Sequence, residues 1–170
     1  MYDLSVDTVY IVDGSSMIAD VYSDSEFFRC GSGYLLRDFL KFVNLDHNDH
    51  RKKVIFIGDD AQLSPVGMKT SPALNSAYLV EGYGLISTGY ELTEVVRQKA
   101  DSGVMQNATA LRQALKENVF NKLDFDLAYI DIAHVDHADL IGRYLESCNH
   151  KINAESIVIA HLNVDVAAYN

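Results

Sequence analysis

Apolar residues in this chain occur in two patterns, short continuous runs and helically spaced sets, and the two alternate along the sequence. The runs at residues 8–13 (TVYIVD), 54–58 (VIFIG) and 156–161 (SIVIAH) are continuous and rich in β-branched residues. Such runs are typical of strands buried on both faces of a sheet. A fourth segment, YELTEVV at 90–96, alternates apolar and polar residues and predicts a half-buried strand.

The helically spaced sets lie between and after these strands. They predict helices over residues 34–45, 71–83, 102–120, 133–147 and 163–170. Asp101 or Ser102 would cap the third of these helices, and Ser15 or Ser16 a short helix after the first strand. Strands that alternate with helices predict an α/β fold with a parallel sheet.

Length and composition describe an ordinary folded chain. Its 170 residues suffice for one core or for two small lobes, and a boundary near Thr88-Gly89 divides it into 1–89 and 90–170. No apolar run approaches the roughly 20 residues that span a bilayer, and the first residues show no export signal. Cys30 and Cys148 lie far apart, which favours free thiols. These features predict a cytoplasmic protein.

The net charge and the histidine clusters limit the partners and metals that the chain is expected to bind. A net charge of −10 argues against tight, non-specific binding of nucleic acid by the chain as a whole, because phosphate contacts need Lys and Arg. The basic residues 51–53 directly precede a predicted strand and are best explained as its solvated lead-in. The His/Asp clusters at 46–50 and 131–137 are expected to be solvated caps rather than zinc sites, which need three or four ligands.

The first strand ends on a carboxylate, Asp13, followed by Gly14 and two serines. In an α/β sheet, ligands bind at the carboxyl ends of the strands. This segment alone leaves three interpretations open: a nucleotide's magnesium, the metal of a nuclease, or an adhesion-type metal site. The last needs Asp-x-Ser-x-Ser, and Met17 stands where the final serine would be.

The most informative stretch is VIFIGDDAQLSPVG, residues 54–67. Gly58 allows a sharp exit from the strand, and Asp59 lies at the end of that strand. Gln62 is suited to bind a phosphate oxygen or a water, and Pro65 stiffens the loop. Gly-Asp-Asp also occurs in RNA polymerases, on a hairpin that holds two metals. That hairpin needs a strand directly after the acids, and a segment containing proline forms one poorly.

This stretch resembles motif III of the superfamily 1B DNA helicases, the group of the exonuclease V alpha subunit (RecD-like), Dda and TraI-like proteins. The pattern Gly-Asp-x-x-Gln-Leu-x-Pro-Val is matched at Gly58, Asp59, Gln62, Leu63, Pro65 and Val66. YIVDGSSM resembles motif II, with matches at Asp13, Ser15, Ser16 and Met17. ELTEVVRQ is similar to motif IV, with matches at Leu92, Arg97 and Gln98. Residues 157–170 are similar to the first strand and helix of the second motor lobe.

The resemblance implies a partial RecA-like P-loop motor fold, a parallel sheet flanked by helices. Residues 1–89 would be the back half of the first lobe and 90–170 the front of the second. The implied activity is ATP-driven translocation on single-stranded DNA in recombination or repair, with Mg²⁺ as cofactor and partner subunits of a helicase–nuclease complex. Asp13 would hold the magnesium through water, Gln62 would sense the γ-phosphate, and Arg97 would close onto the nucleotide. The implied nucleotide site also includes Ser15, Gly58, Asp59 and Gln98.

Two departures from the family pattern stand out. Gly14 occupies the position of a catalytic glutamate, and general-base catalysis of that kind contributes about 10²–10⁴-fold in rate. No Gly-x-x-x-x-Gly-Lys-Ser/Thr loop occurs in the 170 residues. The expectation is therefore a central helicase fragment that does not hydrolyse ATP by itself, with an insertion around residues 22–34.

Two other functions stay open at this stage. A degenerate helicase-derived segment would serve as a binding or scaffold module. A nuclease of the PIN or NYN type also begins with an apolar strand that ends on an aspartate, and it would use Asp13, Asp59 and Asp131 to bind its metal ions.

Overall fold

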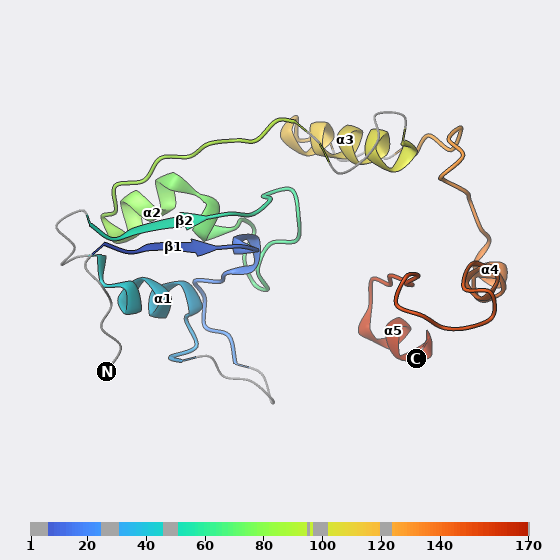
Figure 1. The fold of residues 1–170 in the computed structure, drawn as a ribbon, viewed down its shortest axis with the longest axis horizontal. Coiled ribbons are helices and arrows are strands. Elements are labelled where there is room, and N and C mark those ends of the chain that lie inside the picture. Colours follow the sequence, from blue (N-terminus) through green and yellow to red (C-terminus); the bar gives the residue numbers. More distant parts are fainter. Residues whose placement is uncertain are drawn as a thin grey trace. The chain divides into compact units, whose positions relative to one another are not determined.

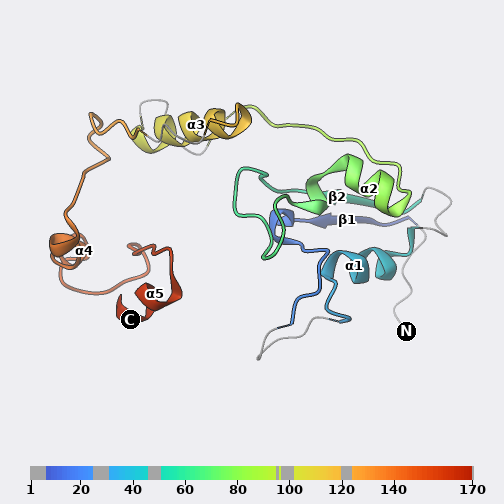
Figure 2. The same cartoon turned by 180° about the vertical axis from the view of Figure 1, so that it is seen from behind.

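The computed structural model describes residues 7–24, 31–45, 51–94, 96, 102–119 and 124–169. The chain divides into two units, Met1–Glu94 and Val95–Asn170. Figure 1 shows the elements of each unit, and Figure 2 shows them from behind.

The first unit is built around two parallel strands. Along the chain it contains β1 (Val9–Val12), the 3-10 turn η1 (Ser15–Met17), α1 (Leu35–Val43), β2 (Lys53–Phe56), the 3-10 turn η3 (Pro72–Leu74) and α2 (Ser76–Tyr83). The strands pair with Ile11 opposite Ile55, and α1 connects them in sequence. The first two predicted strands, the helix between them and the parallel pairing are thereby confirmed.

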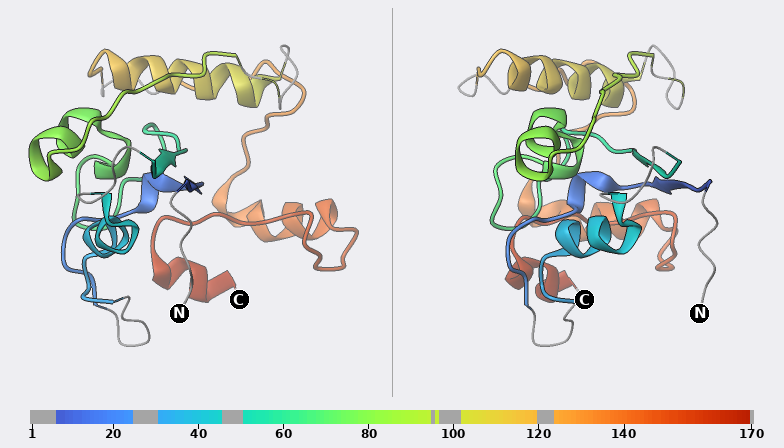
Figure 3. Two further views of the ribbon diagram at one scale, coloured as in Figure 1. Left: turned by 60° about the vertical axis from the view of Figure 1, so that its left-hand side comes forward. Right: turned by 90° about the vertical axis from the view of Figure 1, so that its left-hand side faces the viewer.

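Helix α1 lies alongside the strands (Figures 1 and 3) and covers one face of the pair. The ring of Phe39 packs against Tyr10 of β1 and Phe56 of β2, with ring centroids 6.3 and 5.9 Å apart. The buried core continues from the helix toward η3 and α2 and consists of Leu36, Leu40, Ala73 and Leu79.

The opposite face of the strand pair is largely uncovered by the described residues. Val9, Ile11 and Ile55 alternate with the inward-facing residues and are 54%, 67% and 47% exposed. The sequence predicted strands buried on both faces, and for β1 and β2 this is wrong. A continuous apolar run indicates that both faces tolerate burial, but it does not supply the second covering layer.

The second unit contains helices and no strand within residues 102–119 and 124–169. Its elements are α3 (Gly103–Lys116), the 3-10 turn η4 (His137–Asp139), α4 (Leu140–Ser147) and α5 (Asn163–Tyr169). Ser102 caps α3, since its hydroxyl oxygen accepts a hydrogen bond from the Met105 amide at 3.4 Å. The alternative cap, Asp101, lies outside the described residues. The helix predicted from residue 133 begins later, with η4.

Two predicted strands are not formed. Residues 90–94 have no regular structure, and Leu92 is exposed. Residues 156–160 are also irregular, with Ile157 and Ile159 81% and 87% exposed. β-propensity expresses how well a side chain fits a pleated, half-buried surface, and no strand in the described part of the chain pairs with these segments to provide one. The α/β class is confirmed in its coarse form, as a two-stranded parallel sheet with helices.

No helix in the described part of the chain is long and apolar enough to cross a membrane.

Candidate functional site

The carboxyl ends of β1 and β2 are joined by backbone hydrogen bonds beyond the last paired residues. The Ile57 amide donates to the Val12 carbonyl at 2.8 Å, and the Ser15 amide donates to the Ile57 carbonyl at 2.9 Å. These bonds bring the turn that contains Asp13 next to the segment that begins at Gly58. Five of the residues predicted from the sequence therefore lie together at the carboxyl ends of the paired strands: Asp13, Gly14, Ser15, Gly58 and Asp59.

Asp13 and Gly14 form the turn after β1. The Asp13 side chain is exposed, and its Oδ1 accepts a hydrogen bond from the Gly14 amide at 2.8 Å. Gly14 has φ 67° and ψ 26°, the left-handed conformation, and holds the N-cap position of η1. A Cβ at this position would meet nothing within 4 Å, but the backbone conformation itself costs an L-residue roughly 1–2 kcal/mol. The left-handed conformation of the turn thus explains why glycine occupies position 14.

The two serines after this turn are buried, and each takes part in a hydrogen bond between a side chain and the backbone. The Ser15 hydroxyl donates to the Val12 carbonyl at 2.7 Å, and the Ser16 carbonyl accepts from the Ser71 hydroxyl at 2.8 Å. Neither serine caps η1, so the predicted capping role is wrong: Gly14 occupies that position, and the Ser15 side chain bonds backward to the strand.

The loop after β2 is ordered by its own hydrogen bonds. An added Cβ at Gly58 would lie 2.8 Å from the Ser16 amide nitrogen, so the two strand exits approach too closely for a larger residue. Asp59 accepts from the Ala61 amide through Oδ1 at 3.0 Å and from the Gln62 amide through its carbonyl at 3.1 Å. Pro65 is buried, whereas the Gln62 side chain is exposed. The loop thus presents Gln62 to solvent from an anchored backbone.

The site offers oxygen ligands for a hard cation. Asp13 supplies an exposed carboxylate, Asp59 a half-buried one and Gln62 an amide. Mg²⁺ commonly keeps several waters and binds through one or two carboxylates together with substrate phosphates. Among the residues that the structure describes, no three His, Cys, Asp or Glu side chains come together as a metal cage. Asp13, Asp59 and Gln62 are therefore the described side chains at these strand ends that could hold a hydrated cation.

The other predicted site residues lie outside the described residues or belong to the second unit. Arg97 and Gln98 lie outside the described residues. Asp131 belongs to the second unit and binds the start of α3, accepting from the Ser102 hydroxyl at 2.8 Å and the Gly103 amide at 2.9 Å. These hydrogen bonds, first of all the one from Ser102, lower the pKa of Asp131. Its carboxylate therefore has a local capping role.

A buried carboxylate near the site, Asp20, was missed by the sequence interpretation. Its side chain is only 5% exposed. Oδ2 accepts from the Tyr78 hydroxyl at 2.6 Å, Oδ1 lies 3.9 Å from Nη2 of Arg37, and the Asp20 amide donates to the Met68 sulfur at 3.3 Å. Asp20 thus joins the chain after η1 to α1, to α2 and to the loop after β2. Its position between apolar neighbours in MIADVY was the available signal.

Comparisons of the chain with protein-family models, with curated proteins and with solved structures found no match.

Proposed function

We propose that the paired strand ends are the magnesium- and γ-phosphate-sensing part of an ATP-dependent DNA helicase or translocase of the superfamily 1B type. In this proposal Asp13 holds hydrated Mg²⁺, and Gln62 contacts the terminal phosphate. Arg97 and Gln98 would complete the nucleotide site, and single-stranded DNA would be the partner. Because the sequence contains no phosphate-cradling loop, we expect these 170 residues not to hydrolyse ATP by themselves.

The observation that carries the proposal is the adjacency of the two motif-like segments. The two segments that resemble helicase motifs II and III lie about 45 positions apart along the chain. The Ser15–Ile57 and Ile57–Val12 hydrogen bonds bring them to one edge of a parallel strand pair. A carboxylate after one strand and a loop-borne amide after the next is an arrangement that can serve one metal–phosphate group.

The test uses Mn²⁺ as a paramagnetic substitute for Mg²⁺, with ATP present, and records amide NMR signals of the full chain. We expect Mn²⁺ to broaden the amide signals of residues 13–16 and 58–62 before others. Asp13→Asn should remove most of this broadening. Asp60→Asn makes the same charge change one residue beyond Asp59 and should leave it largely intact. Broadening that is spread over all acidic residues, or that Asp13→Asn does not alter, would contradict the proposal.

A metal-dependent nuclease is the second candidate, because Asp13 and Asp59 follow adjacent strands. The third acid that the nuclease would use, Asp131, accepts hydrogen bonds from Ser102 and Gly103 at the start of α3. The two functions differ in a simple assay on single-stranded DNA with Mn²⁺ or Mg²⁺. The helicase proposal predicts no cleavage by the chain, whereas cleavage that disappears in Asp13→Asn would replace it with the nuclease.

A further inference from the structure

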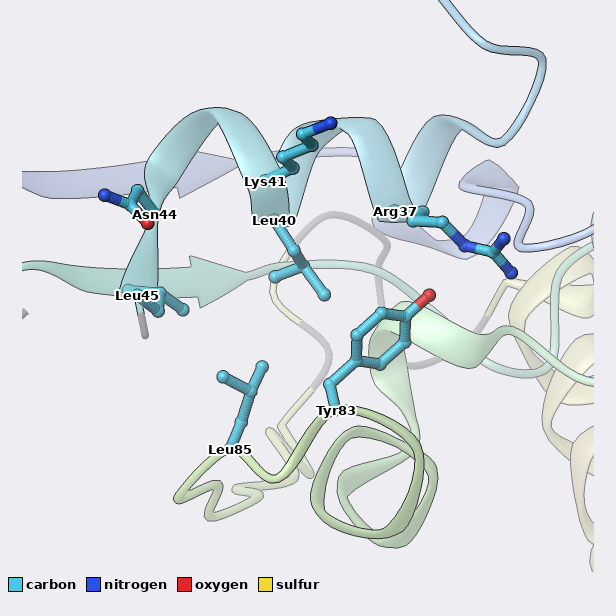
Figure 4. Close-up of a pocket in the computed structure, with 7 residues that line it drawn as sticks. All are labelled: Arg37, Leu40, Lys41, Asn44, Leu45, Tyr83 and Leu85. Carbon is cyan, nitrogen blue, oxygen red and sulfur yellow. The ribbon is translucent and has the colours of Figure 1, made fainter. Parts of the chain in front are cut away.

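A small hollow lies between α1 and the end of α2, apart from the strand ends discussed above. Its volume is about 210 Å³. Figure 4 shows Leu40, Leu45 and Leu85 pointing toward one another along one part of its wall, with the ring of Tyr83 beside them. None of these residues belongs to the proposed nucleotide site. The hollow therefore has an apolar wall at one end and a phenol hydroxyl at the other.

Two buried polar atoms without a hydrogen bond lie at this end: the Tyr83 hydroxyl lines the hollow, and Asp20 Oδ1 lies outside the lining, 3.9 Å from Arg37 Nη2. Within the described residues, Asp20 Oδ1 and the Tyr83 hydroxyl are both buried and form no hydrogen bond of normal geometry. Buried polar atoms of this kind usually have a partner, and leaving one without costs about 1–3 kcal/mol. Burial, followed by the nearby Asp20 carboxylate, raises the pKa of Tyr83 to about 12. The hydroxyl therefore stays protonated near neutral pH and can donate a hydrogen bond.

The charges around the hollow favour an anion. Arg37 and Lys41 lie one helical turn apart on α1 and both line the hollow, whereas none of its described lining residues is acidic. In Figure 4 the Arg37 guanidinium lies near the Tyr83 hydroxyl. The Lys41 ammonium points away from the leucines. The guanidinium also packs over the ring of Tyr34, 4.3 Å from its centroid, which holds its plane in place. The hollow is thus lined by two cations, and the carboxylates that interact with them, Asp20 and Asp38, lie outside its lining.

We propose that this hollow binds a small monocarboxylate with a compact apolar body. The carboxylate accepts hydrogen bonds from Tyr83 and Arg37, and the body lies against Leu40, Leu45 and Leu85. The volume is below the roughly 300–1,000 Å³ of typical ligand pockets, so the occupant is smaller than a nucleotide or a drug-sized molecule. Planar, forked recognition of a carboxylate is what an arginine side chain provides best.

The experiment titrates the full chain with benzoate and with its neutral analogue, benzyl alcohol, and follows the amide NMR signals of α1 and α2. We expect benzoate to bind about tenfold or more tightly than benzyl alcohol, because charge-assisted hydrogen bonds are lost with the neutral head. Arg37→Gln should weaken benzoate binding by about tenfold and leave benzyl alcohol nearly unchanged. Tyr83→Phe should weaken benzoate binding in the same direction.

Two further variants keep the proposal falsifiable. Arg143→Gln removes the same charge from α4 in the second unit and should leave benzoate binding unchanged. Leu85→Trp fills the hollow and should abolish binding of both probes, even if Arg37→Gln proves to unfold the chain. Benzoate that shifts no signal of α1 or α2, or that Arg143→Gln weakens as much as Arg37→Gln does, would overturn the proposal. Mn²⁺ titration of the strand ends is independent of these outcomes, so the two proposals can fail separately.

Discussion

The two units each contain an amphipathic helix, and these two helices differ in how much they bury. In the first unit, α1 completely buries Leu36 and Val43 against its surroundings. In the second unit, α3 is longer, yet Val104 and Leu115 are about half exposed and its buried residues are Gly103 and Asn107. The Asn107 side chain donates hydrogen bonds to the Gly103 and Asp126 carbonyls. The buried contact of α3 is therefore polar, whereas the buried contacts of α1 are apolar. Helical periodicity thus specifies an apolar face but not the element that covers it.

The largest effect is expected from truncating one leucine in each helix to alanine. Leu36→Ala should lower the free energy of unfolding of the first unit by about 2–5 kcal/mol, because a fully buried side chain is replaced by a cavity. Leu115→Ala in α3 should cost less than about 1 kcal/mol, since its side chain is 47% exposed. Chemical denaturation followed through NMR signals assigned to each unit measures both. Equal losses would show that α3 buries its apolar face as α1 does.

A smaller effect is expected from adding one methyl group to a glycine of each unit. Gly58→Ala places a Cβ 2.8 Å from the Ser16 amide nitrogen and 2.9 Å from Leu74 Cδ1, and should destabilise the first unit by about 1–3 kcal/mol. Gly142→Ala in α4 meets nothing within 4 Å and should stabilise its helix by up to about 1 kcal/mol. The same unfolding experiment applies. A neutral Gly58→Ala would mean that the strand exits can separate without cost.

The local part of this architecture could be predicted from the sequence. The runs around Ile11 and Ile55, the spacing of α1, and the Ser102 cap are all encoded within a few residues. Parallel pairing followed from the alternation of strands and helices, and it placed Asp13 near Gly58. The grouping of the strand-end residues was therefore predictable, although their function stays a proposal.

The remaining features depend on contacts between distant residues, which no local pattern contains. The segment around Ile157 has the composition of a buried strand, but it pairs with no strand among the described residues. Asp20 reaches Tyr78 across 58 positions of sequence, and Ser71 reaches Ser16 across 55. The described residues cover one face of the sheet and leave the other largely exposed for the same reason, because burial depends on which distant segments pack against a strand.

The smallest expected effect is a pH response that both units share. Asp131 in the second unit and Asp38 in the first have lowered pKa values, caused chiefly by hydrogen bonds from Ser102 and from Ser32 respectively. A carboxyl group whose pKa is lowered by folding stabilises the folded state above its unfolded pKa of about 4, and this stabilisation is lost as the pH falls through the folded pKa. Acidification should therefore loosen the first turn of α3 and the Ser32 turn locally, without unfolding either unit.

The measurement for these two carboxylates is an NMR titration below pH 5 of the amides that they bind. The Gly103 amide, 2.9 Å from Asp131 Oδ1, and the Ser32 amide, 2.6 Å from Asp38 Oδ2, should each shift with an inflection below the ordinary aspartate range. Asp131→Asn should remove the inflection at Gly103 and leave that at Ser32, and Asp38→Asn should do the reverse. If one substitution removed both inflections, the two carboxylates would titrate as a coupled pair. Independent inflections would show that each unit responds to acid through its own hydrogen bonds.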